Sequence, residues 1–247
     1  MAFEGKVAIV TGGTRGIGEA ITTMLVQQGA TVAAGYSRDV DAAEACRARL
    51  ERDGSRVSLH QGRVDVPADC ERVVAEALTL HGRVDYLVNN AGITIDKTVR
   101  RMTNDDWQHV LNVNLFGAFA MIKAVLEHMI ERGSGRIVNI SSVIGETGNV
   151  GQANYAAAKS GLFGMTKSIA LEMAQKGITI NCVAPGFIET QMVAAIPAPA
   201  LQKIVDKIPQ RRLGKPSEVA RVVCFLLNDE SSYITGAAYA VNGGLDM

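Results

Sequence analysis

The chain has 247 residues, of which 47% are hydrophobic and 5% aromatic, so it can bury a large core. Its formal net charge is zero, which gives no reason to expect a polyanion such as nucleic acid as a partner. The first residues, MAFEGKVAIV, lack the basic start and long apolar run of a secretion signal. We see no apolar run near the roughly 20 residues of a membrane span. We therefore expect a cytoplasmic protein without membrane contacts.

Cysteines and histidines are dispersed along the chain. The cysteines, which show no CxxC spacing, are Cys46, Cys70, Cys182 and Cys224. This pattern predicts free structural thiols in a reducing compartment. No two histidines stand at a spacing typical of metal ligands, so we expect no metal site.

Seven short apolar segments alternate with longer segments of helical period. They span residues 6–10, 31–36, 56–60, 84–89, 135–141, 178–184 and 238–242. Near-continuous apolar strands between helices indicate a parallel sheet covered on both faces. With right-handed crossovers, the pattern predicts an α/β, doubly wound (Rossmann) domain with seven parallel strands. Without a repeat or linker, we expect one domain over residues 1–247.

Residues 185–216 interrupt this alternation, and five of the six prolines lie there. An insertion with short helices at the carboxyl edge of a parallel sheet is where a substrate lid would lie. We predict a lid at about residues 187–215. An elaborate connection without a function of its own is the alternative.

A glycine-rich turn, VAIVTGGTRGIGEA, runs from the first predicted strand into the first predicted helix. Glycines allow backbone to approach a pyrophosphate closely, and the following helix N-terminus attracts its negative charge. The spacing is G-x3-G-x-G rather than the G-x-G-x-x-G of the standard dinucleotide fingerprint. We assign cofactor contacts to Gly12, Thr14, Arg15, Gly16, Ile17 and Gly18.

The second predicted strand ends in GYSRD. An NAD site usually has Asp or Glu at this point to bind the ribose hydroxyls. Here Tyr36, Ser37 and Arg38 occur, and Arg15 lies in the glycine turn. Guanidinium groups bind a 2′-phosphate bidentately, so we predict NADP(H) as the cofactor. In the alternative, Asp39 supplies the acid of an NAD site and Arg38 is merely solvated.

The segment QANYAAAKSG places Tyr155 and Lys159 four residues apart, one turn apart on the same helix face. A cation near a phenol favours the phenolate, so the pair has the composition of a proton-transfer site. By itself it also fits an ordinary helix. Three more polar features accompany it: Ser142 after the strand at 135–141, the NNAG sequence at 89–92, and Asn114 within NVNL.

Together, TGGTRGIG, NNAG, NVNL, Ser142, Tyr155-x3-Lys159 and PGFIET resemble the short-chain dehydrogenase/reductase family over essentially the whole chain. The resemblance implies that Tyr155 is the general acid that protonates a carbonyl as hydride arrives from NADPH. It implies that Lys159 holds the nicotinamide ribose and lowers the pKa of Tyr155, and that Ser142 binds the substrate carbonyl. It also implies that Asn114 anchors a water, although Asn114 could instead bond a backbone carbonyl within a helix kink.

Further cofactor contacts are implied by the same resemblance. Asn90, Ala91 and Gly92 would line the adenine ribose, and Val64 would contact the adenine through its backbone. The contacts expected at the nicotinamide carboxamide and the phosphates are Pro185, Gly186, Ile188 and Thr190. One position departs from the family pattern. Relatives usually carry Asp or Asn before this valine to bond the adenine amino group, whereas this chain has Arg63, which cannot accept that bond but could stack on the ring.

The segments GNVGQANY and PGFIET are most similar to 3-oxoacyl-acyl-carrier-protein reductases, and acetoacetyl-coenzyme A reductases share Asp96 and Gln152. We therefore expect NADPH-dependent reduction of a 3-oxoacyl thioester, with acyl-carrier protein or coenzyme A as the carrier. The predicted substrate contacts are Ser142, Gln152, Tyr155 and Phe187. Arg132 and Lys176 lie at or beside the positions of a basic docking patch for the acidic carrier protein; a solvated surface explains them equally well.

The sequence disfavours two other functions, and the family resemblance implies an oligomeric assembly. An NAD-dependent alcohol or sugar dehydrogenase is disfavoured by the sequence Tyr36-Ser37-Arg38, and a non-catalytic NADP(H)-sensing module is disfavoured because Tyr155 and Lys159 are both present. Family members are commonly tetramers through two long helices, here at 103–132 and 153–175. We therefore predict a homotetramer.

Overall fold

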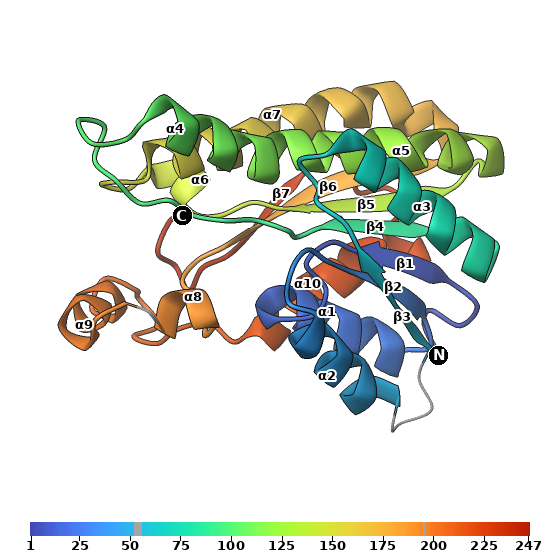
Figure 1. Ribbon diagram of the computed structural model, residues 1–247, viewed down its shortest axis with the longest axis horizontal. Helices are drawn as coiled ribbons and strands as arrows, with labels where there is room; N and C mark the ends of the chain where they lie inside the picture. The colour runs from blue at the N-terminus through green and yellow to red at the C-terminus, as the bar shows by residue number, and fades with distance from the viewer. Residues whose placement is uncertain (52–55, 195) are drawn as a thin grey trace.

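The computed structural model describes residues 1–51, 56–194 and 196–247. It confirms the predicted doubly wound α/β fold with one seven-stranded parallel sheet (Figure 1). The strands are β1 (Val7–Val10), β2 (Thr31–Tyr36), β3 (Val57–Gln61), β4 (Tyr86–Asn89), β5 (Gly135–Ile140), β6 (Ile178–Pro185) and β7 (Ala238–Val241). Their order is β3-β2-β1-β4-β5-β6-β7, so the strand order reverses between β1 and β4. In such sheets ligands bind outside the carboxyl ends of the strands, at this reversal.

Helices cover both faces of the sheet. The longer ones are α1 (Gly16–Gln27), α2 (Val40–Glu51), α3 (Pro67–His81), α5 (Gly117–Arg132), α7 (Ala153–Met173) and α10 (Pro216–Leu227). Shorter ones are α4 (Asn104–Leu111), the π-helix η1 (Asn112–Phe116), α6 (Ile144–Thr147), the 3₁₀ helices η2 (Ala174–Lys176) and η3 (Asp229–Ser231), and α8 (Gln191–Ala194) and α9 (Ala198–Val205). In Figure 1, α3, α5 and α7 cover one face, and α1, α2 and α10 lie across the other.

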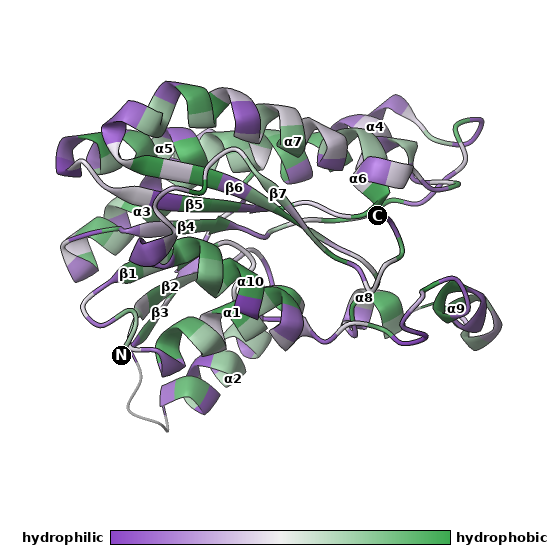
Figure 2. Ribbon diagram, turned by 180° about the vertical axis from the view of Figure 1, so that it is seen from behind, coloured by the Kyte–Doolittle hydropathy of each residue, from purple (hydrophilic) through white to green (hydrophobic). Residues whose placement is uncertain are grey.

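Each face of the sheet has its own hydrophobic core. On one face, Leu25 of α1 and Val223 of α10 pack with Val88 of β4. On the other, Met121 of α5 and Ile137 of β5 belong to a second cluster. Figure 2 shows mostly hydrophobic strands between helices of mixed hydropathy. Each fully buried side chain of this size stabilises the fold by about 1.5–3 kcal/mol, which holds the strand ends rigidly.

One finding corrects the sequence analysis. The continuous helical stretch Asn104–Arg132 is long and apolar enough, by length and composition, to cross a membrane. Polar residues at its beginning break the apolar run, so the run is not evident from the sequence alone. A helix that covers a sheet meets the same criterion, and Met121, Ile122, Val125 and Met129 of this stretch are buried in the second core cluster.

The proline-rich segment leaves and rejoins the fold at neighbouring points. Ile188 and Gly214 form an isolated parallel bridge, and Gly214 N–H donates to the Phe187 carbonyl over 2.9 Å. Between them lie α8 and α9, which stand apart from the two helical layers in Figure 1. The predicted lid therefore corresponds to a distinct loop with two short helices; its residue 195 lies outside the described residues. A lid function stays a prediction.

Candidate active site

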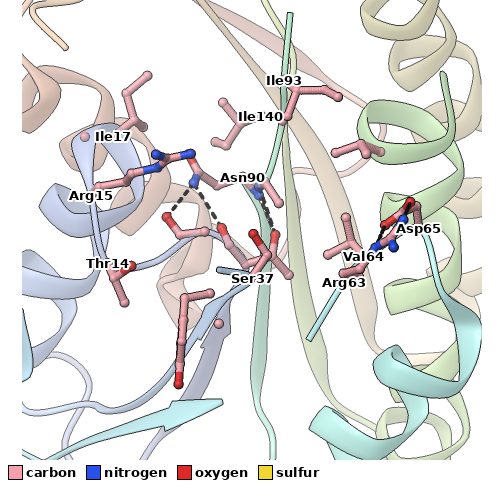
Figure 3. A pocket seen from close by; sticks show the side chains of 18 of the residues that line it. Thr14, Arg15, Ile17, Ser37, Arg63, Val64, Asp65, Asn90, Ile93 and Ile140 are labelled. Atoms are coloured by element: carbon pink, nitrogen blue, oxygen red, sulfur yellow. Dashed lines mark hydrogen bonds and ion pairs between the residues drawn. The ribbon is translucent and has the colours of Figure 1, made fainter. Parts of the chain in front are cut away.

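A cavity of about 760 Å³ lies at the carboxyl edge of the sheet. Its lining residues run along the strand ends from the glycine turn to Tyr155 and Lys159 of α7. Figure 3 shows part of the lining of this cavity, including Thr14, Asn90 and Ile140. Most residues predicted from the sequence to bind cofactor or substrate line it: Gly12, Thr14, Arg15, Gly16, Ile17, Tyr36, Ser37, Arg38, Val64, Asn90, Ala91, Gly92, Ser142, Tyr155, Lys159, Pro185, Gly186, Ile188 and Thr190. Residues from widely separated segments are thus brought to one site.

The glycine turn requires glycine at three positions. Gly12 and Gly16 have φ angles of 60° and 56°, in the left-handed region that side chains disfavour. Gly18 does not line the cavity, because it lies against the backbone of the glycine turn. A Cβ on Gly18 would lie 2.0 Å from the Gly12 carbonyl oxygen, so glycine lets α1 start directly under the turn. The turn therefore presents its backbone to the cavity at a helix N-terminus, as a pyrophosphate requires.

At the other end of the cavity, Gly92 performs a similar function. A Cβ there would lie 2.6 Å from Asn114 Oδ1 and 3.6 Å from Lys159 Nζ. The backbone after β4 thus lies against the catalytic candidates without a side chain between them. Space bounded by glycine at both ends, with guanidinium groups near one end and an ammonium at the other, fits a dinucleotide cofactor.

Thr11 and Asn90 join β1 to β4 at the cavity floor. Thr11 Oγ1 accepts hydrogen bonds from the backbone N–H groups of Asn90 and Ala91, each over 3.0 Å. The Asn90 side chain donates to the carbonyls of Thr11 and Gly12 over 2.9 and 3.1 Å. Sequence analysis missed Thr11, and the only signal was a hydroxyl residue directly after an apolar strand. These bonds fix the turn before any ligand arrives.

The turn after β1 and the end of β2 supply the positive charge expected for NADP(H). Arg15 and Arg38 line the cavity with exposed side chains, and Ser37 lies beside Arg38. Asp39 also lines the cavity, but its Oδ1 accepts the backbone N–H of Ala42 over 3.0 Å at the start of α2. The carboxylate of the alternative NAD site is therefore engaged in capping a helix.

Lys159 is buried, with 4% of its surface exposed. Its Nζ donates to the Ile140 carbonyl at the end of β5 over 2.7 Å and lies 5.6 Å from the centre of the Tyr155 ring. Ser141 Oγ donates to the Lys159 carbonyl over 2.8 Å, which ties α7 to the same strand end. Ser142 Oγ accepts the N–H of Ile144 over 3.1 Å, so the serine hydroxyl can donate its proton to the Tyr155 oxygen or to a substrate oxygen.

The acidity of Tyr155 differs from our expectation. The pKa of Tyr155 is raised to about 12, mainly by burial; the Asp96 carboxylate acts in the same direction, and a hydrogen bond with the Ser142 side chain acts against it. Burial also lowers the pKa of Lys159 to about 8. The net shift is therefore upward, opposite in sign to the expected lowering, because desolvation of the phenol outweighs what favours the phenolate. The contribution of Lys159 to the acidity of the phenol stays a prediction. Tyr155 holds its proton at neutral pH.

Asn114 lies within η1, where the helix widens to a π-turn. Its Nδ2 donates to the carbonyls of Val110 and Ile93 over 2.8 and 2.9 Å, and its Oδ1 accepts the N–H of Ile93 over 3.2 Å. These are the contacts of the second interpretation, a side chain that bonds backbone in a helix kink. Asn114 does not line the cavity, and its water-binding role stays a prediction.

Two predicted substrate residues do not line this cavity, namely Gln152 and Phe187. Gln152 Nε2 donates to both carboxylate oxygens of Asp96 over 3.1 Å, and Gln152 Oε1 accepts from Asn149 over 2.8 Å. Phe187 is half-buried and begins the loop closed by Gly214. Both therefore lie outside the part of the site that the strand ends form.

Of the two basic docking candidates, Arg132 is engaged internally. Its guanidinium lies 3.5 Å from the buried carboxylate of Asp85, which also pairs with Arg83. Lys176, in η2, is exposed. Lys176 is thus the freer of the two charges for contact with an acidic partner.

The chain is similar to known proteins over nearly its whole length. A family model described as "Enoyl-(Acyl carrier protein) reductase" matches residues 12–246. The chain belongs to the short-chain dehydrogenase/reductase family. Similar members of this family include the 3-oxoacyl-(acyl-carrier-protein) reductases FabG of Salmonella typhimurium and Escherichia coli, 47% and 46% identical over the full length of both chains. An acetoacetyl-CoA reductase of Shinella zoogloeoides is 46% identical and covers 97% of this chain and 98% of its own.

Proposed function

We propose that this member of the short-chain dehydrogenase/reductase family reduces a 3-oxoacyl thioester, carried by acyl-carrier protein, to the 3-hydroxyacyl thioester with NADPH. The observation that carries the proposal is that Ser142, Tyr155 and Lys159 line the same cavity as the glycine turn. The names of the similar reductases support the substrate class over the whole length of the chain.

The choice of NADP(H) over NAD(H) rests on the end of β2. Arg15 and Arg38 are exposed in the cavity wall, where they can bind a 2′-phosphate, and Asp39 is engaged with Ala42. The glycine turn and the N-terminus of α1 would hold the pyrophosphate. When bound, NADPH supplies the hydride.

Tyr155 and Ser142 would act on the substrate carbonyl. With a pKa of about 12, the Tyr155 phenol is protonated at neutral pH and can donate its proton to the developing alkoxide. Ser142, whose oxygen already accepts from Ile144, can donate its hydrogen to the same carbonyl oxygen and fix its orientation. Both donors would then stabilise negative charge as it develops on that oxygen.

The positive charge of Lys159 would support Tyr155 and Ser142. Its pKa of about 8 leaves it mostly protonated at neutral pH, although it is buried. The ammonium lies near Gly92 and within 5.6 Å of the Tyr155 ring, so it can hold ribose hydroxyls and stabilise the phenolate left after proton donation. Proton return to Tyr155 would pass through this lysine.

Acetoacetyl-CoA reduction is a second candidate, favoured by the 46% identity to the Shinella zoogloeoides enzyme. Matched kinetics separate the two: kcat/KM for acetoacetyl-acyl-carrier protein and for acetoacetyl-CoA, each with NADPH and NADH. We expect at least about tenfold preference for NADPH and for the carrier protein. Tenfold preference for NADH would instead support a NAD-dependent dehydrogenase. Tight nucleotide binding without turnover of any substrate would support a sensing module.

We also propose that the loop 187–215 closes over the thioester.

We propose further that the chain forms a homotetramer. The outer side of the helical layer carries Phe116 and Phe119, exposed by 40% and 44% with ring centres 6.4 Å apart, which supports burial against another subunit. Analytical ultracentrifugation tests the assembly, and a monomer at micromolar concentration contradicts it.

A further inference from the structure

The loop after β3 forms part of the cavity wall. In a doubly wound fold the pyrophosphate lies at the turn after β1 and the adenosine ribose at the end of β2, so the adenine lies beyond them, toward β3. Arg63, Val64 and Asp65 line the cavity there. Figure 3 shows them on the side opposite Thr14 and Arg15.

Asp65 is the buried member of an ion pair. Its side chain is 11% exposed, whereas that of Arg63 is 51% exposed. Arg63 Nε lies 3.1 Å from Asp65 Oδ1, and its Nη2 lies 2.5 Å from Oδ2. Arg63 is also fixed at its backbone, because its N–H donates to Asp69 Oδ2 over 2.8 Å. The guanidinium is therefore directed along the wall to Asp65, which is not the orientation expected for stacking across an adenine.

The pair keeps Asp65 ionised. The hydrogen bond from Arg63 holds the pKa of the Asp65 carboxyl below its usual range, and the charge of His109, which lines the same cavity, acts in the same direction. A carboxylate offers about four lone-pair directions, and a bidentate guanidinium occupies two of them. Asp65 thus keeps acceptor capacity in the cavity wall.

We propose that Asp65, oriented by Arg63, accepts a hydrogen bond from the 6-amino group of the cofactor adenine. The inference rests on the proposed dinucleotide binding and names the residue that reads the base. Adenine presents an amino donor where hypoxanthine presents an oxygen, so a fixed carboxylate discriminates between the two. Asp65 thereby replaces the acceptor that relatives carry at position 63, and Arg63 is a positioning residue.

Isothermal titration of the full-length protein with NADP⁺ and with its hypoxanthine analogue tests the assignment without any turnover. For the unchanged protein we expect about tenfold tighter binding of NADP⁺, the value of one charged hydrogen bond. Asp65→Asn should bring the two dissociation constants within about threefold, because an amide can donate to the hypoxanthine oxygen. Asp39→Asn is the matched control: it changes another carboxylate of the cavity wall and should keep the tenfold ratio.

Two more variants separate reading of the base from support of the loop. Arg63→Met should lower the ratio, whereas an equal loss for both nucleotides would assign Arg63 to loop structure alone. The double variant Arg63→Asn with Asp65→Ala moves the acceptor to the position used by relatives and should restore the preference for adenine. It also serves as the test if Asp65→Asn does not fold.

A full tenfold ratio in Asp65→Asn overturns the proposal. Failure of the proposed cofactor is a different result: the unchanged protein would bind NAD⁺ more tightly than NADP⁺. The ratio between NAD⁺ and its hypoxanthine analogue then tests Asp65 in the same way. Absence of binding to all four nucleotides overturns both the function and the assignment.

Discussion

The two sides of the cavity are built differently. On the strand-end side, Thr11, Asn114 and Lys159 are buried and each bonds backbone groups of a neighbouring segment. On the other side, the first residues of the loop 187–215, from Ile188 to Val193, contribute to the wall, and the Ile188–Gly214 bridge closes the loop. The helix α9 of this loop does not line the cavity, and none of its described residues is buried. One side is held by buried polar contacts between elements, and the other is attached mainly at its two ends.

This difference matches two different requirements. Proton donation needs the donor and its support held within about 0.5 Å of the productive position, which buried hydrogen bonds provide. The proposed lid would have to open and close, and segments with few buried contacts open at the lowest free-energy cost. Changes on the strand-end side should therefore affect kcat and stability, and changes in the loop should affect KM.

After Tyr155→Phe, the largest effect is expected for Lys159→Met. The variant keeps the aliphatic stem but removes the ammonium, so it should lower kcat/KM with NADPH by about 10³-fold while the chain still folds. Steady-state kinetics measure the loss. Lys167→Met, an exposed position on the same helix, is the control and should retain full activity. Equal kinetics in the two variants would remove Lys159 from the mechanism.

Asn114→Ala should destabilise the protein by about 2–3 kcal/mol, because it leaves the Ile93 and Val110 groups without a partner. Urea unfolding measures this. Asn112→Ala in the same π-turn loses only an exposed bond with Gln108 and should cost less than about 1 kcal/mol. Similar losses for both would mean that the buried bonds of Asn114 do not hold the turn.

The buried ammonium also predicts a pH dependence of stability. The pKa of Lys159 falls from 10.5 to about 8 on folding, so between these values the unfolded chain binds a proton that the folded protein has released. The free energy of unfolding should therefore rise with pH in this window, by about 1 kcal/mol per pH unit relative to Lys159→Met. Below pH 8 the difference should be constant. Parallel curves for the two proteins across the window would contradict the lowered pKa.

The smallest effect is expected at the end of the loop. Arg212 pairs with both carboxylate oxygens of Glu218 over 2.7 and 2.8 Å, and both side chains are on the surface. Arg212→Met should raise KM for the thioester by about threefold, with kcat and melting temperature unchanged. Amide hydrogen exchange should become faster within 187–215 only. A loss of kcat instead would assign the loop to the rigid side of the site.

Local patterns in the sequence were sufficient for the strands and for the glycine turn, because both depend on neighbouring residues. Contacts between distant segments were not predictable in the same way: the two hydrogen bonds to Thr11 form only after β1 and β4 become adjacent. The raised pKa of Tyr155 was missed because burial depends on the whole fold. Asp65 was missed because its pairing with Arg63 became visible only with side chains in place.

The proton-donor role of Tyr155 is tested most directly by Tyr155→Phe, with the dissociation constant of NADP⁺ and the rate of NADPH oxidation by a 3-oxoacyl thioester measured on the same sample. Loss of the hydroxyl removes the donor but keeps the ring beside Lys159. We predict unchanged nucleotide affinity and a rate reduced by about 10³-fold or more. A rate equal to that of the unchanged protein would contradict the assignment of the general acid.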